Sequence, residues 1–231
     1  MLPDLGARFP EELWDIRLGA TYRHKLDNDW IAGGSVTAGS ASDKPFSSTD
    51  ELFVRAFGFL RVPHGERNAW IVSLYYASDA EFLGGIPVPG IAYEYAPSES
   101  FQALIGAPFS SVRYRPFDKL TLEALYAPVR RVRARATYQV FRPLRIYAGF
   151  DWDHESHFRA DRGGKDDKLF YYEKRLTGGV RFDLRHVGIE VFGGRTFDRF
   201  YFEGNGYSDR DENRIDVHDG WFGAARLSVR F

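Results

Sequence analysis

The stretch that decides the fold is the carboxyl-terminal one, Trp221-Phe222-Gly223-Ala224-Ala225-Arg226-Leu227-Ser228-Val229-Arg230-Phe231. Every second residue from Trp221 to Val229 is apolar or small, and the alternate positions include Arg226, Ser228 and Arg230. A period of two residues is typical of a β-strand, because successive side chains point to opposite faces of the sheet. This stretch is therefore expected to form a strand with one apolar and one polar face.

The same alternation recurs along the chain and predicts about twelve strands. It is clear at 14–24 and 52–62 and most regular after residue 120. Between 131 and 140, for example, arginine occupies three alternate positions and mostly apolar residues lie between them. Within 101–115 the parity changes near Pro108, which we interpret as a bulge in one strand because proline cannot donate to a ladder.

Composition excludes several classes of protein. The 31 basic and 32 acidic side chains nearly balance, so nothing indicates a nucleic-acid partner. The absence of cysteine excludes a disulfide framework and thiolate zinc sites, and the scattered histidines predict no metal site and no cofactor. No apolar run reaches the roughly 18 residues of a membrane-spanning helix. The start, Met1-Leu2-Pro3-Asp4, has no signal-peptide pattern, so a signal peptide is expected to have been removed already.

Alternation alone fits both a membrane barrel and a soluble sandwich or lipocalin-like barrel, because each has one apolar face. Four features favour the membrane barrel. The expected strand count is even, which lets the ends of the sheet meet and removes free edges. The strands are long, the apolar faces are rich in alanine and glycine, and the tryptophans lie on the apolar parity near strand ends, where a membrane-interface girdle would be. These tryptophans are Trp14, Trp30, Trp70, Trp152 and Trp221. The prediction is an all-β fold, a transmembrane antiparallel up-and-down β-barrel spanning 13–231, after a short periplasmic segment at 1–12.

Three segments resemble an uncharacterised family of bacterial outer-membrane β-barrel proteins. They are Ile86-Pro87-Val88-Pro89-Gly90, Ile105-Gly106-Ala107-Pro108-Phe109-Ser110-Ser111-Val112-Arg113-Tyr114-Arg115-Pro116, and the terminal Phe231. The resemblance implies a location in the bacterial outer membrane, in contact with its lipid and lipopolysaccharide. It also implies that Phe231 is a signal read by the barrel-assembly machinery. It supplies no catalytic residues.

The connections should be unequal at the two ends of such a barrel. If residue 231 ends on the periplasmic side, the turns at 117–118, 142–143 and 184–186 are short periplasmic ones. The segments 157–167 and 204–220 are then long outer loops. If strands are counted backward from residue 231 in the same way, the segments 43–50 and 81–90 are rather long periplasmic connections.

The charged parity would line the lumen of the barrel, and it contains more arginine than acid. One interpretation is a narrow pore or cavity that prefers anions. The other is a structural barrel, with a protein partner in the envelope, in which the arginines pair with carboxylates and close the interior. The candidate lumen or anion-binding residues are Arg113, Arg115, Arg131, Arg133, Arg135, Arg145, Arg175, Arg181 and Arg226.

An enzymatic alternative rests on His154 and Ser156, whose spacing resembles that of outer-membrane lipid A deacylases. A nucleophilic serine needs a base and a carboxylate that orients the base. By parity both residues would point outward, and the nearby acids Glu155 and Glu173 lie on the other face. The sequence therefore favours a non-enzymatic role and keeps a lipid-modifying hydrolase as an alternative.

Overall fold

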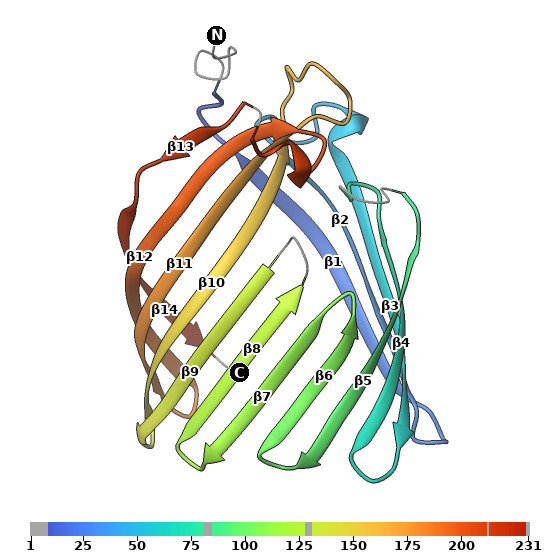
Figure 1. The fold of residues 1–231 in the computed structure, drawn as a ribbon, viewed down its shortest axis with the longest axis vertical. Helices are drawn as coiled ribbons and strands as arrows, with labels where there is room; N and C mark the ends of the chain where they lie inside the picture. Colours follow the sequence, from blue (N-terminus) through green and yellow to red (C-terminus); the bar gives the residue numbers. More distant parts are fainter. Residues whose placement is uncertain (1–8, 81–84, 128–130, 212, 230–231) are drawn as a thin grey trace. The chain divides into compact units, whose positions relative to one another are not determined.

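The computed structural model describes residues 9–80, 85–127, 131–211 and 213–229, and these residues form an all-β fold (Figure 1). Fourteen strands and two short 3-10 turns are present in these ranges, and no helix there has the length and apolar character needed to cross a membrane. The strand bounds are β1 Trp14–Lys25, β2 Ile31–Ser42, β3 Leu52–His64, β4 Asn68–Ala77, β5 Val88–Ser98, β6 Phe101–Ala107, β7 Ser110–Phe117, β8 Leu120–Ala127, β9 Arg131–Phe141, β10 Leu144–Phe158, β11 Lys168–Asp183, β12 Val187–Gly204, β13 Ile215–Val217 and β14 Gly220–Val229.

The strands hydrogen-bond in chain order from β1 to β13, and β14 pairs with β12. One further pairing, between Phe158 of β10 and Ser42 of β2, is parallel and joins β10 back to β2. The strands from β2 to β10 therefore form a closed β-barrel of nine strands, and the other five strands lie outside this ring. The closing pair must be parallel, since an odd number of up-and-down strands leaves the first and last pointing the same way.

The prediction of a barrel of about twelve strands is therefore wrong, because nine strands close the ring and the described residues contain fourteen strands in all. The segment 101–115 is not one bulged strand but the hairpin β6–β7, in which Leu104 lies opposite Ser111. Pro108 lies in the connection between these two strands, where its missing N–H is not required by the ladder. The other extra strand is the three-residue β13, which precedes the closing strand β14.

By its internal contacts the chain divides into two units. Unit 1 comprises Met1–Ala92, Glu155–Tyr171 and Phe200–Ile215, and unit 2 comprises Tyr93–His154, Tyr172–Arg199 and Asp216–Phe231. Strands such as β10 contribute residues to both units.

Unit 1 contains a small aromatic core where its long connections meet. Phe53, Phe170 and Phe202 are almost completely buried, and the rings of Phe170 and Phe202 stack with centroids 4.7 Å apart. Buried Arg159 beside this core donates to Glu203 at 3.2 Å. These ion-paired and aromatic side chains hold the ends of β10, β11 and β12 together within unit 1.

The connection after β2 also belongs to this end of unit 1. The Ala160 backbone N–H donates to the Asp43 carboxylate at 2.9 Å, and Lys165 forms an ion pair with Asp50 at 3.0 Å. The segment 43–50 thus lies beside the loop at 157–167, and the prediction that these two segments lie on opposite sides is wrong. Splitting 101–115 into two strands is the reason, because an added strand inverts the side of every earlier connection.

Candidate functional site

In β4, β11 and β12, apolar side chains at alternate positions are the exposed ones. In β12, Ile189 and Val191 are 45% and 57% exposed, whereas Glu190 between them is only 6% exposed. In β11 the apolar Leu176 and Val180 are likewise exposed. Among the described residues, 34 large apolar side chains are exposed and 12 apolar residues are buried. In β11 and β12 the two-residue period thus leaves apolar side chains exposed, while Glu173 and Glu190 are buried.

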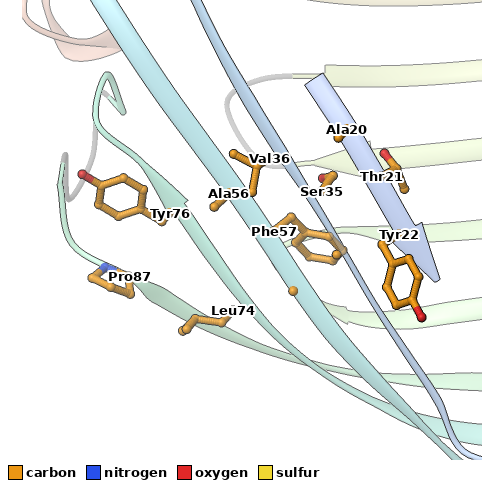
Figure 2. Close-up of a pocket in the computed structure, with 12 residues that line it drawn as sticks. Ala20, Thr21, Tyr22, Ser35, Val36, Ala56, Phe57, Leu74, Tyr76 and Pro87 are labelled. Atoms are coloured by element: carbon orange, nitrogen blue, oxygen red, sulfur yellow. The ribbon is translucent and has the colours of Figure 1, made fainter. Parts of the chain in front are cut away.

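Unit 1 carries a hollow of about 590 Å³ along β1–β4 (Figure 2). Small residues such as Ala20, Gly34 and Gly58 line it, and bulkier residues including Tyr22 and Leu74 also line it. A Cβ added at Gly58 would meet no atom within 4 Å, so space rather than backbone crowding surrounds this position. The hollow has no charged side chain in its lining, which makes it a poor candidate for catalysis.

The richer site is a charged cluster in unit 2, which begins as a ladder between β9 and β10. Antiparallel register places Arg131 opposite Asp153 and Arg133 opposite Asp151, and directly opposed charges on one face interact. Arg131 donates from Nε and Nη2 to the Asp153 carboxylate at 3.0 and 3.3 Å, and Arg133 Nε donates to Asp151 at 2.6 Å. The alternation of arginine and aspartate in the sequence thus becomes a row of ion pairs.

The cluster continues onto β11, β12 and β14 through two buried glutamates. Glu190 accepts a hydrogen bond of 2.7 Å from the Tyr147 hydroxyl, and Arg226 Nη1 lies 3.6 Å from its other oxygen. Glu173 is paired with Arg175, and Arg199 Nε lies 3.8 Å from it. Both carboxylates are therefore compensated, as buried charges require.

Arg135 differs from the other arginines of the cluster. Its guanidinium carbon lies 4.4 Å from the centre of the Tyr147 ring, a cation–π contact. Across the described part of the chain, no carboxylate lies within ion-pairing distance of Arg135. At the position where the ladder would supply an acid, β10 has Gly149.

A cavity of about 160 Å³ lies among these side chains. Its lining combines four arginines, four acids, two aromatic residues and a threonine. These residues are Arg133, Arg135, Tyr147, Asp151, Asp153, Glu173, Arg175, Thr177, Glu190, Phe192 and Arg226. This volume is smaller than the roughly 300–1,000 Å³ typical of sites for organic ligands.

The nine candidate arginines divide between this cluster and other places. Arg131 pairs with a lining acid, and Arg133, Arg135, Arg175 and Arg226 line the cavity. The remaining candidates do not line it. Arg113 pairs with Glu123 at 3.5 Å, Arg115 donates to the Glu99 carbonyl oxygen at 2.9 Å, and Arg145 and Arg181 both pair with Asp183.

The candidate lumen residues, nine arginines, did not include Tyr147, Thr177 or Phe192, although the two-residue period places Tyr147 and Thr177 on the charged faces of their strands. The position of Tyr147 follows from the alternation of the sequence, which places it on the charged face of β10 between Arg145 and Gly149. Phe192 and Thr177 join the cavity through pairing of strands distant in sequence, which the local pattern does not report.

The tryptophans lie at different positions along their strands, some near an end and one in the interior. Trp14 is the first residue of β1, opposite Ser42, whereas Trp30 and Trp70 lie near the short turns at the other end of unit 1. In unit 2, Trp221 is the second residue of β14 and is 84% exposed. Trp152 is not near a strand end as predicted, because β10 continues to Phe158. Phe231 lies outside the described residues.

The enzymatic candidates do not assemble into a triad. His154 and Ser156 both lie near the end of β10. Within the described residues, Ser156 Oγ has no hydrogen bond, so no base is in place to activate it. His157, the next residue along, is buried and also belongs to β10. The geometry therefore supplies no activated nucleophile here.

The fold and the site define an all-β protein with a closed ring of nine strands, an ion-paired cluster on β9–β12 and β14, and many exposed apolar side chains. No protein-family model, curated protein or solved structure matches the chain.

Proposed function

We propose that this protein is an integral β-barrel of the bacterial outer membrane with a structural, constricted interior closed by ion pairs. The single observation that carries the proposal is the inversion of burial in β12, where Glu190 is buried between exposed Ile189 and Val191. Hydrocarbon is the medium in which exposed aliphatic side chains have no cost, whereas paired charges are best placed away from it.

The extent of the apolar surface supports this proposal. A soluble monomer rarely exposes contiguous apolar patches larger than a few hundred Å², because each Å² of apolar surface left in water costs about 25 cal/mol. The exposed apolar side chains recur on nearly every strand of this protein rather than in one patch. Acyl chains of outer-membrane lipid and lipopolysaccharide would cover such a surface continuously.

Strand lengths are also consistent with a membrane span. A tilted transmembrane strand needs about 9–11 residues. β1 and β2 have 12 residues each, whereas β10, β11 and β12 have 15, 16 and 18. The surplus of these three strands contains the buried Phe158, Phe170 and Phe202 in unit 1. We assign that aromatic core to the part of the barrel that projects beyond the lipid.

The interior is proposed to be closed to organic solutes. Each of Asp151, Asp153, Glu173 and Glu190 is engaged by at least one arginine, so the arginines mainly neutralise acids across neighbouring strands. The cavity of about 160 Å³ is smaller than the 300–1,000 Å³ typical of sites for organic ligands. A stable barrel wall, with an envelope protein as its partner, is therefore favoured over a wide channel.

Cell fractionation with heat-modifiable gel migration tests the proposal. The full-length precursor expressed in a Gram-negative host should appear in the outer-membrane fraction. It should resist extraction with urea and migrate faster before boiling than after. A protein that remains in solution without detergent would contradict the proposal and support the lipocalin-like alternative. Pull-down in mild detergent then identifies a partner.

A further inference from the structure

We propose that the cavity of unit 2 binds one small inorganic anion, such as phosphate or chloride, through Arg135. This deepens the proposed function and rests on it for the setting of the cavity in a membrane protein. The cluster has five guanidinium groups, Arg131, Arg133, Arg135, Arg175 and Arg226, and four carboxylates, Asp151, Asp153, Glu173 and Glu190. One positive charge is in excess, and Arg199 adds a further contact to Glu173.

The excess charge is located at Arg135 by the register of the sheet. Arg131 and Arg133 each oppose an aspartate on β10, but Arg135 opposes Gly149. On its other side Arg135 is opposite Glu123 of β8, and that glutamate forms an ion pair with Arg113 at 3.5 Å. β10 therefore supplies no carboxylate opposite Arg135, and the carboxylate of Glu123 on β8 is paired with Arg113, whereas Arg131 and Arg133 are each paired with an aspartate of β10.

The surroundings of Arg135 suit an anion. The Tyr147 ring contacts the guanidinium, and all five guanidinium N–H groups lie in one plane, so a face contact leaves them able to donate. Arg226 holds Glu190 only at 3.6 Å, and Thr177 provides a hydroxyl in the same lining. A guanidinium fork binds oxyanions with two parallel hydrogen bonds.

The size of the cavity decides the class of ligand. About 160 Å³ accommodates a halide or a tetrahedral oxyanion together with water, but not a sugar phosphate or a nucleotide. The four acids of the lining are already engaged by arginines, which reduces their repulsion of an anion. The site is therefore expected to bind selectively but weakly, with one anion per chain.

Isothermal titration calorimetry tests this site on the folded full-length chain in a non-ionic detergent, titrated separately with inorganic phosphate and chloride. At least one of these anions should bind with one-to-one stoichiometry. Arg135→Gln should weaken binding by about tenfold or more, as expected for loss of a charge-assisted contact. Gly149→Asp should weaken it similarly by supplying the missing carboxylate. Arg195→Gln, which changes an exposed arginine paired with Asp219, is the matched control and should leave affinity unchanged.

Two results would overturn the site: no binding of either anion, or binding that survives both Arg135→Gln and Gly149→Asp. Heat-modifiable migration of each variant establishes that it is folded. The membrane proposal fails independently, through solubility without detergent, and a soluble protein with Arg135-dependent anion binding would retain the site. A membrane-inserted barrel without such binding would retain the proposed function and lose the site.

Discussion

The Tyr147 hydroxyl on β10 donates a hydrogen bond of 2.7 Å to Oε1 of Glu190 on β12, and Glu190 is 6% exposed. The other oxygen of this carboxylate, Oε2, lies 3.6 Å from Nη1 of Arg226. A buried carboxylate that loses a donor retains its desolvation cost. This relationship links β10, β12 and β14 in unit 2 and should contribute measurably to stability.

Replacement of Tyr147 by phenylalanine should therefore destabilise the barrel by about 1–3 kcal/mol. The temperature at which the fast-migrating folded form is lost on a detergent gel measures the effect. Tyr126→Phe is the control, because Tyr126 is exposed and its hydroxyl has no hydrogen bond within the described residues. Equal midpoints for the two variants would show that the Tyr147 hydrogen bond contributes little.

The polarity of the outer face can be tested at Ile189, which is 45% exposed. If this face contacts lipid, Ile189→Arg should cost about 2–4 kcal/mol near the membrane midplane. In water the same surface substitution should change stability by no more than about 0.5 kcal/mol. Folding into lipid vesicles, followed by denaturant titration, separates these outcomes, with Ile189→Leu as the conservative control. A neutral Ile189→Arg would contradict the lipid-facing assignment.

Trp221 should report contact with lipid directly, because it is 84% exposed on the apolar face. In vesicles of brominated lipid, whose bromines quench nearby indoles, the protein fluorescence should be quenched. Trp221→Phe should remove a large part of that quenching. Trp152→Phe should remove little, since Trp152 is partly covered and its ring lies 5.7 Å from that of Tyr172. Quenching that is insensitive to Trp221→Phe would place this residue away from lipid.

Acid resistance should depend on Asp79, in the connection after β4. Burial raises the pKa of Asp79, but the hydrogen bonds and charge of Arg55, with the charge of Lys168, outweigh it and leave the pKa below its usual value. A carboxyl group with a lowered folded pKa stabilises the protein above its unfolded pKa of about 3.9. That stability is lost as pH falls through the lower folded pKa.

Arg55→Gln should consequently move the acid-unfolding midpoint, measured by tryptophan fluorescence, to higher pH. Asp29→Asn is the control. Its exposed ion pair with Lys25 is screened by salt, and asparagine tolerates the positive φ of this turn position. An unchanged midpoint in Arg55→Gln would mean that the Arg55–Asp79 pair does not govern acid stability.

Much of the local structure was predictable from the sequence. Strands at 14–24 and 52–62 were expected and form β1 and β3 with almost the same bounds. The charged parity of 131–140 correctly indicated a row of arginines on one face, because side-chain direction in a strand follows from position alone. The same reasoning failed at 101–115, since a proline between two alternating runs fits a bulge and a hairpin equally well.

The sequence by itself determined which segments are strands, which side chains share a face, and that one face is apolar while the other carries charge. Only the tertiary structure decided that β2 and β10 close the ring, that 43–50 lies beside 157–167, and that Arg135 faces Gly149 on β10 and a glutamate of β8 that is paired with Arg113. The alternation of apolar and polar residues is a property of consecutive positions, so it can be recognised within a single strand. Closure and register depend on contacts between residues far apart in the chain, and many pairings satisfy the same local period.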